Sequence, residues 1–485
     1  MGIVQNQSFK NTIITYFGFG LGAINVLFLF THFLSDEYHG LVAFVLSTAN
    51  IMMPIFALGV HNTIIKFYSS FKTRNNSNSF LTLMLIMPLF IIVPVGLLGY
   101  TAYDAITDML SSENAIIKEH VWLIFVAGAL FSYFEIFYSW AKVQLQSVFG
   151  NFMKEVFHRV GVMLLFGIIY MNWIDVSQFI YGVVIVYALR TIFMMFYAFS
   201  VRRPVFRLSK IPKLPEVIKY SLLIIIAGSV ANIILEIDKF MLGEYIPIEN
   251  VAYYGVAIYI ASVIGVPSRS MHQITNPITA KLLNDKDDSG LKVLYQKSSL
   301  NLFIISGLIF LLIIANINQL YAIIPEKFGG ALFVVFVVSV AKLSNSIIGN
   351  NNAILFNSNY YRIVLLFGAL LAVVAVVLNI GLIPEYGIDG AAMATFISII
   401  AYNAAKVWYV SYKFKIQPFT FATLKTFILI LIMIGLFYFW EFPFHPFLNI
   451  AFKSILIGLL YVIVVYKLNL SEDIKAVLDQ WKNRI

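Results

Sequence analysis

Long apolar runs follow one another along almost the whole chain, separated only by short polar segments. A helix of about 20 apolar residues crosses the roughly 30 Å hydrocarbon core of a bilayer. Fourteen stretches fit that description in the 485 residues, and we predict a transmembrane helix for each. The predicted spans are 12–33, 41–64, 80–103, 121–141, 156–171, 179–199, 217–235, 251–277, 300–324, 331–356, 363–383, 391–412, 426–440 and 448–466.

The composition excludes a water-soluble fold. The chain is 60% hydrophobic and 12% charged, whereas soluble domains are roughly 45–50% apolar and about 25% charged. Membrane-spanning β-strands need only about 9–11 residues of alternating hydrophobicity, so these longer runs indicate helices. A helix also satisfies its backbone hydrogen bonds internally, which lipid requires. The absence of cysteine excludes disulfides and thiolate metal sites.

The basic residues indicate the orientation. With the N-terminus inside, 25 of the 33 lysines and arginines fall in inside segments or at the inside ends of spans, three fall outside and five lie deeper within spans. Cytoplasmic loops of membrane proteins are enriched in Lys and Arg. We therefore predict that both termini are cytoplasmic and that the first span is an uncleaved helix. The net charge of +9 follows from this topology, and no nucleic-acid partner is expected.

The longest basic loop, at residues 202–219, contains three prolines and looks like a joint between two halves. An approximate repeat agrees, because 37–43 and 253–257 are similar and each leads into a span with a proline, Pro54 or Pro267. Repeats of this kind are common in transporters. The predicted parts are an N-terminal six-helix lobe (1–200), a basic cytoplasmic linker (201–219), a C-terminal six-helix lobe (220–412), two additional helices (413–466) and a cytoplasmic tail (467–485).

Four short stretches, at 34–41, 57–60, 237–243 and 386–394, occur in an order and at loop positions typical of one family. Through them the chain resembles the lipid-linked oligosaccharide flippases, of O-antigen and capsule type, in the polysaccharide-transport branch of the multidrug/oligosaccharidyl-lipid/polysaccharide exporter superfamily. The resemblance covers residues 8–412. It implies an all-α fold with two six-helix lobes around a central cavity, an alternating-access cycle and a location in the bacterial inner membrane.

Charges at membrane depth are the residues most informative about function. Such charges are costly, so they usually face a protein interior or a wet cavity. Five cations fall within predicted spans, and Glu135 is the only clearly embedded acid. The cations are Arg190, Arg269, Lys342, Lys406 and Lys453. Their excess favours an anionic cargo, such as a glycan linked to a polyprenyl pyrophosphate, over a cationic drug.

Lys342 is the strongest candidate for a cavity residue. It lies eleven residues into its span, which corresponds to about 16 Å of helix rise and places it near mid-bilayer. Ser339, Ser346 and Asn350 share its helix face, and Asn345 is a further polar candidate nearby. The alternative is a buried lysine that pairs with a neighbouring helix.

Arg269 is the second cationic candidate, and it follows Pro267 in the eighth span. His272 shares its helix face, although a lone histidine is more often an interior residue than a functional one. A guanidinium binds two phosphate oxygens through parallel hydrogen bonds, which suits a pyrophosphate group. We predict that Arg269 and Lys342 bind the phosphates of the cargo.

The remaining embedded polar residues leave two interpretations open. Arg190 either lines the cavity or pairs structurally, with Glu135 as a candidate partner. Lys406 and Lys453 are close enough to span ends to extend their ammonium groups toward the interface. Asn50 and Asn232 are candidates for the cavity, but small and polar residues also mediate helix packing in membranes.

Two other functions deserve comparison with lipid-linked glycan transport. A drug/cation antiporter of the same superfamily would use an embedded carboxylate, for which Glu135 is the candidate. A membrane-embedded glycosyltransferase would use acids such as Asp36 and Glu37, but the outside loops are too short to form a domain. No glycine-rich nucleotide-binding loop appears. We expect no enzyme activity and no cofactor, membrane lipids as neighbours, H⁺ or Na⁺ as the coupling ion, and a functional monomer.

The predicted topology can be tested by labelling single introduced cysteines with a membrane-impermeant maleimide, because the native chain has none. Cysteines replacing Ser112 and Asp389 should be labelled from outside. Cysteines replacing Asn76 and Ser289 should be labelled only after the membrane is permeabilised. The reverse pattern would contradict the orientation.

Overall fold

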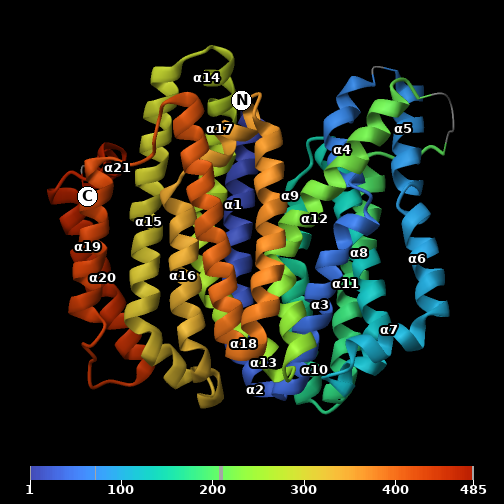
Figure 1. The fold of residues 1–485 in the computed structure, drawn as a ribbon, viewed down its shortest axis with the longest axis horizontal. Helices are drawn as coiled ribbons and strands as arrows, with labels where there is room; N and C mark the ends of the chain where they lie inside the picture. Colours follow the sequence, from blue (N-terminus) through green and yellow to red (C-terminus); the bar gives the residue numbers. More distant parts are fainter. Residues whose placement is uncertain (1, 72, 207–210, 483–485) are drawn as a thin grey trace. The chain divides into compact units, whose positions relative to one another are not determined.

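The computed structural model describes residues 2–71, 73–206 and 211–482, without the side chains of 2–6, 8, 9, 226–235, 270, 273, 361, 481 and 482. Within these ranges all regular secondary structure is helical (Figure 1), which confirms the predicted all-α membrane fold class. The chain divides into two compact units. The first contains Met1–Gly255 and Val376–Ile388, and the second contains Val256–Ala375 and Asp389–Ile485. The finer lobe and linker boundaries expected from the sequence remain a prediction.

Most elements of the first unit are α-helices, joined by short 3-10 and π-helical turns. They are α1 (Gly2–Ala23), η1 (Ile24–Leu29), α2 (Phe30–Phe33), α3 (Asp36–Phe56), α4 (Val60–Phe67), η2 (Tyr68–Ser70), α5 (Arg74–Ile86), α6 (Leu89–Thr101), α7 (Tyr103–Leu110), η3 (Ala115–His120), α8 (Val121–Lys142), α9 (Val148–Phe152), η4 (Met153–Phe157), α10 (His158–Tyr170), α11 (Val176–Val201) and α12 (Leu214–Tyr245). Helix α13 (Glu249–Ser262) begins in this unit and continues into the second.

The second unit contains the longer helices of the C-terminal half. Its elements are η5 (Val263–Gly265), α14 (Val266–Asn284), α15 (Asp288–Ile323), η6 (Glu326–Ala331), α16 (Leu332–Ile347), α17 (Asn351–Asn357), α18 (Tyr361–Phe414), α19 (Phe421–Phe437), α20 (Pro446–Lys467) and α21 (Glu472–Lys482). Part of α18, Val376–Ile388, belongs to the first unit.

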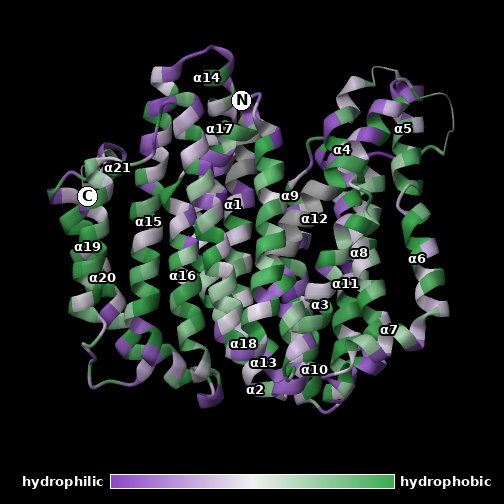
Figure 2. Ribbon diagram, viewed as in Figure 1, coloured by the Kyte–Doolittle hydropathy of each residue, from purple (hydrophilic) through white to green (hydrophobic). Residues whose placement is uncertain are grey.

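Among the described residues, ten helices are long and apolar enough to cross a membrane. One of them, Arg362–Phe414, has non-helical backbone angles at Gly387 (φ 58°, ψ −132°), so it consists of two helices. The 17-residue Phe421–Phe437 is a shorter apolar helix. The total of fourteen spans therefore remains a prediction. Figure 2 shows hydrophobic residues along the middle of most helices and hydrophilic residues at their ends.

Two of the predicted spans are broken where the backbone adopts positive φ angles. Between α3 and α4, Leu58 and Gly59 have φ angles of 48° and 64°. The Ser221 hydroxyl from α12 donates a 3.0 Å hydrogen bond to the Leu58 carbonyl oxygen. Because lipid offers no hydrogen-bond partner, a carbonyl freed by a helix break needs one from the protein. The serine of the neighbouring helix provides it.

The second break, at Gly349 between α16 and α17, is built in the same way. Gly349 has φ 51°, and the hydroxyl of Ser299 on α15 donates to the Ile347 carbonyl oxygen. A Cβ atom at Gly349 would lie 2.6 Å from the backbone of Ser299. Glycine is therefore required both for its left-handed conformation and for the close approach of α15. The break turns an asparagine-rich segment into the interior of the second unit.

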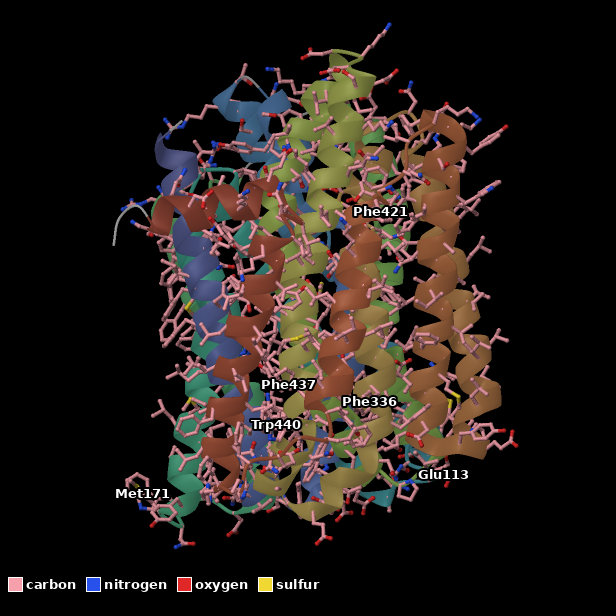
Figure 3. All side chains as sticks on the ribbon, turned by 90° about the vertical axis from the view of Figure 1, so that its left-hand side faces the viewer. Glu113, Met171, Phe336, Phe421, Phe437 and Trp440 are labelled. Atoms are coloured by element: carbon pink, nitrogen blue, oxygen red, sulfur yellow. The ribbon has the colours of Figure 1, made fainter. Side chains whose placement is uncertain are left out.

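The last two membrane helices pack against α15. Figure 3 shows Phe421 and Phe437 at opposite ends of α19, and the Phe437 ring stacks on Trp440 with centroids 5.6 Å apart. On α20, the Tyr461 hydroxyl donates to the Ile304 carbonyl oxygen of α15 at 3.0 Å. Lys453, expected to reach the interface, is instead fully buried and pairs with Glu441 at 3.3 Å.

Replacing Gly349 by alanine should destabilise the protein. A left-handed backbone costs an alanine about 1–2 kcal/mol, and the contact with Ser299 adds to this cost. Gly435→Ala is the matched control, because a Cβ at this α19 position meets no atom within 4 Å. Thermal unfolding in detergent should show a lower midpoint for Gly349→Ala and no loss for Gly435→Ala. Equal midpoints would mean that the break tolerates a side chain.

Candidate functional site

Lys406 is a deeply buried cation of the second unit. It lies in the part of α18 that follows Gly387, and only 1% of the residue is exposed. Its Nζ donates a 3.1 Å hydrogen bond to Asn352 Oδ1 and lies 4.0 Å from the centroid of the Tyr402 ring. No carboxylate of the described residues lies within ion-pairing distance of it. The expectation that Lys406 extends to the interface is wrong, because the break at Gly349 places Asn352 beside it.

Asparagines surround this lysine on both sides of the helix break. Asn403, one turn before Lys406, donates to Ser344 Oγ at 2.9 Å and to Asn345 Oδ1 at 2.8 Å. Asn350 is buried and donates to the Thr279 hydroxyl of α14. The buried amide oxygens of Asn350 and Asn403 have no hydrogen-bond partner among the described residues. The cluster therefore combines a buried positive charge with unused hydrogen-bond acceptors.

The two predicted phosphate-binding cations lie on neighbouring helices of the same unit. Arg269 on α14 is exposed, and Lys342 on α16 is half-buried. The hydroxyl oxygens of Ser268 and Ser346 are 3.4 Å apart, so the two helices meet one turn beyond Lys342. His272 is half-buried on α14, close enough to Lys406 for their charges to interact. The second unit thus contains Arg269, His272, Lys342 and Lys406, on helices α14, α16 and α18. The sequence had singled out the first three as candidate cavity residues.

Arg190 occupies a different environment in the first unit. It is 7% exposed on α11, and its guanidinium carbon lies 4.0 Å, 4.7 Å and 5.4 Å from the ring centroids of Phe134, Tyr187 and Phe131. Aromatic faces stabilise a buried cation by roughly 0.5–2 kcal/mol each. Of the two interpretations left open, this geometry fits structural pairing, although the partners are rings rather than Glu135.

Glu135 on α8 is already paired with a basic residue. Its carboxylate accepts a hydrogen bond from Lys154 Nζ at 2.5 Å, and its side chain is 14% exposed. Lys154 lies in the turn η4, nineteen residues further along the chain. The pair neutralises the one acid that the sequence identified as clearly embedded.

Asp238 on α12 is a second buried carboxylate, which corrects the count of a single embedded acid. It is 6% exposed and accepts hydrogen bonds from the Tyr254 hydroxyl at 2.5 Å and from Asn379 Nδ2 at 2.8 Å. Asn379 belongs to the segment of α18 that is part of the first unit. Position 238 follows the predicted end of the seventh span, so hydropathy alone assigns it to a loop. The helix continues to Tyr245 and buries it.

The other candidates of the first unit are less informative. Asn50 is half-buried on α3, and the side chain of Asn232 lies outside the described residues. Asp36, a candidate enzyme acid, accepts a 2.8 Å hydrogen bond from the Tyr253 hydroxyl, which gives it a structural partner. Among the described residues, no group of three or more His, Cys, Asp or Glu side chains is placed to hold a metal ion.

A family model described as "Polysaccharide biosynthesis protein" matches residues 4–282, which is more than half of the chain. The chain belongs to this family. The match includes α1 to α13 and Arg269 and His272 on α14. The family assignment confirms the resemblance to the polysaccharide-transport branch. No curated protein sequence matches the chain significantly.

The chain shares its fold with solved flippases and transporters. The chain is similar to the structure titled "Lipid II flippase MurJ, inward closed conformation", with a TM-score of 0.73, 16% identity, and coverage of 95% of this chain and 99% of that one. It also resembles an inward-facing multidrug resistance MATE family transporter, with a TM-score of 0.59, 13% identity, and coverage of 86% of this chain and 96% of that one. The Vibrio cholerae MATE transporter VcmN in the bent form is similar as well, with a TM-score of 0.56, 12% identity, and coverage of 89% of this chain and 100% of that one. At these identities the likeness establishes the fold, which is that of multi-pass membrane transporters.

The environment of Lys406 predicts opposite effects for two substitutions. Lys406→Met removes a desolvated charge that no described carboxylate balances, so the thermal midpoint should stay equal or rise. Asn352→Ala leaves the buried ammonium without its acceptor, which should cost about 1–3 kcal/mol. Thermal unfolding of the purified variants measures both effects. A comparable loss in both variants would show that Lys406 is balanced by another group.

Proposed function

We propose that this polysaccharide biosynthesis family member moves a lipid-linked anionic glycan from the cytoplasmic to the outer leaflet of the bacterial inner membrane, by alternating access. The cargo in this proposal carries a polyprenyl pyrophosphate. The proposal is supported by three cations of the second unit that lie within predicted spans, Arg269, Lys342 and Lys406, and by the asparagine-rich helix break that provides Asn352 to Lys406. The family assignment and the fold of a lipid II flippase support it.

The phosphate-binding role rests on Arg269 and Lys342. Both lie within spans predicted from hydropathy, and the contact between Ser268 and Ser346 joins their helices. In a site of low effective dielectric, cations attract phosphate more strongly than they do in water. The planar guanidinium of Arg269 suits two oxygens of one phosphate, whereas Lys342 contributes a point charge.

The glycan-binding role rests on the amides around the helix break. Sugar hydroxyls are hydrogen-bond donors and acceptors, and Asn side chains offer both kinds of group. Asn345 is exposed, and Asn350 and Asn403 have buried amide oxygens without partners among the described residues. A discontinuous helix that presents polar groups at membrane depth is typical of substrate sites in transporters.

Export of a cationic drug is the weaker candidate, although MATE transporters share the fold. A cation antiporter needs a carboxylate that can exchange a proton or Na⁺ for the cargo. Glu135 is engaged by Lys154 at 2.5 Å, and Asp238 accepts two hydrogen bonds from neutral donors. The positive charges of Arg269 and Lys342 would repel a cationic drug.

The proposed phosphate contacts can be tested by complementation in cells that lack the native protein. Arg269→Ala and Lys342→Ala should each abolish glycan export, and Arg269→Lys should retain part of it because the charge remains. Lys342→Glu should fail more completely than Lys342→Gln. Lys425→Ala, at an exposed basic position of α19, is the matched control and should export normally. Membrane abundance is measured alongside. Normal export by both alanine variants at normal abundance would contradict the proposal.

A further inference from the structure

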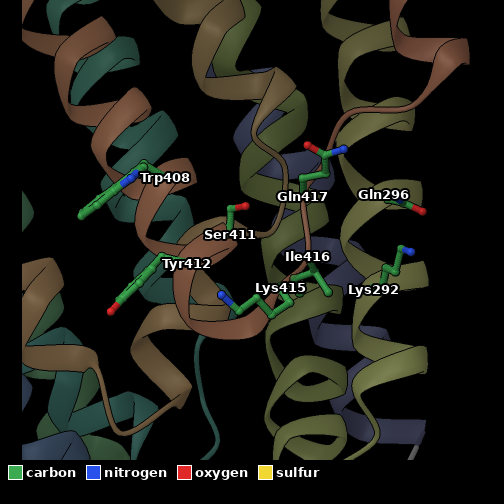
Figure 4. Close-up of a pocket in the computed structure, with 8 residues that line it drawn as sticks. All are labelled: Lys292, Gln296, Trp408, Ser411, Tyr412, Lys415, Ile416 and Gln417. Atoms are coloured by element: carbon green, nitrogen blue, oxygen red, sulfur yellow. The ribbon is translucent and has the colours of Figure 1, made fainter.

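A polar cavity lies where the N-terminal part of α15 meets the C-terminal part of α18 and the segment that follows it, all within the second unit (Figure 4). It has a volume of about 490 Å³, within the range of small-molecule sites. Lys292 and Gln296 line it from α15, and Trp408, Ser411 and Tyr412 line it from α18. The segment after α18 contributes Lys415, Ile416 and Gln417. None of these eight lining residues is acidic, so two positive charges dominate the cavity.

The cavity offers a phosphate two cations and several neutral hydrogen-bond donors. Lys292 and Lys415 are exposed, so their ammonium groups are accessible. The Ser411 hydroxyl and the amides of Gln296 and Gln417 are hydrogen-bonding groups of the same cavity. Lysines 292 and 415 both belong to segments predicted to be cytoplasmic. Basic pockets between membrane helices on that side are suited to anionic lipid head groups.

Two stacked aromatic rings, of Trp408 and Tyr412, lie on α18 at the edge of this cavity, and Figure 4 shows them directed away from Lys292 and Gln296. The rings of Trp408 and Tyr412 are nearly parallel, at 7°, with centroids 5.8 Å apart. They are 64% and 54% exposed. Trp and Tyr are enriched at the level of lipid head groups, because their rings are amphipathic. The cavity therefore lies at the depth where a phospholipid carries its phosphate.

An exposed apolar stripe continues from these rings along α18. Ile397, Ala401, Ala404 and Trp408 follow one another at helical spacing on one face, and all four are exposed. Ala404 and the buried Lys406 are two positions apart, about 200° around the helix, so the stripe faces away from the interior of the unit. The two alanines leave a shallow surface between larger side chains. An acyl chain attached to a head group in the cavity has an apolar path along this stripe.

We propose that this cavity is a binding site for an anionic phospholipid, with the phosphate between Lys292 and Lys415 and an acyl chain along the stripe from Trp408 to Ile397. The polar cavity alone could bind any phosphate group. The adjoining apolar stripe favours a phosphate that carries a hydrocarbon chain, because the chain can pack along it. The site is separate from the cluster around Lys342 and Lys406. The proposal does not depend on which cargo the protein transports.

Native mass spectrometry of the purified full-length protein, titrated with phosphatidylglycerol in detergent, tests this site. The double variant Lys292→Ala/Lys415→Ala should bind the lipid at least about tenfold more weakly than the native chain, given the usual contribution of each lysine near a membrane surface. Lys292→Arg/Lys415→Arg should retain binding, because both charges remain. The matched control is Lys281→Ala/Lys286→Ala, which removes two exposed lysines of a neighbouring segment and should leave binding unchanged.

Two further ligands separate the sources of the phosphate. Phosphatidylcholine with the same acyl chains should bind the native protein at least tenfold more weakly than phosphatidylglycerol, and inorganic phosphate at equal concentration should not displace the lipid. Equal binding of phosphatidylglycerol to the pocket and control variants would overturn the proposal. Equal binding of the two lipids, or displacement by inorganic phosphate, would overturn it as well. If the alanine pair unfolds, Lys292→Gln/Lys415→Gln is used under the same criteria.

Discussion

The structure depends on one constraint, which is that every backbone polar group at membrane depth needs a partner within the protein. A continuous helix meets this constraint alone, but two predicted spans are interrupted, at Leu58–Gly59 and at Gly349. At both breaks a serine of a neighbouring helix, Ser221 or Ser299, donates to the freed carbonyl. The interruption is therefore stable only when the neighbour is correctly packed, which couples local backbone geometry to helix packing.

The polar interior of the second unit follows from the break at Gly349. Helix α16 ends at Ile347 and α17 begins at Asn351. Because the helix is interrupted there, the asparagines at and just after the break contact different neighbouring helices. Asn350 bonds to Thr279, whereas Asn352 accepts from Lys406. The same local geometry thus gathers buried amides and provides an acceptor for a buried lysine. In the first unit, by contrast, aromatic rings surround Arg190, and Lys154 neutralises Glu135.

The helical class and the family were predictable from the sequence, because hydrophobic length and loop charge determine where helices can lie in lipid. The position of a charge along its predicted span, as for Lys342, can be counted from the sequence, and its depth in the membrane stays a prediction. The surroundings of a charge could not be predicted, because they depend on contacts between distant positions. Lys406 looks like a residue near a helix end, and only Asn352, on another helix, explains its burial. The burial of Asp238 could not be predicted, because helix α12 continues past the apolar part of its sequence into a more polar part.

The buried pair of Lys453 and Glu441 has a consequence for how the C-terminal region enters the membrane. A lysine within a hydrophobic helix costs about 2.5–3.5 kcal/mol on scales derived from translocon insertion when it lies centrally. Glu441, in the connection between α19 and α20, lies 3.3 Å from Lys453. Asn449 donates to the same carboxylate at 3.0 Å. The connection therefore supplies the carboxylate that Lys453 needs, and we expect α20 to insert together with this connection rather than alone.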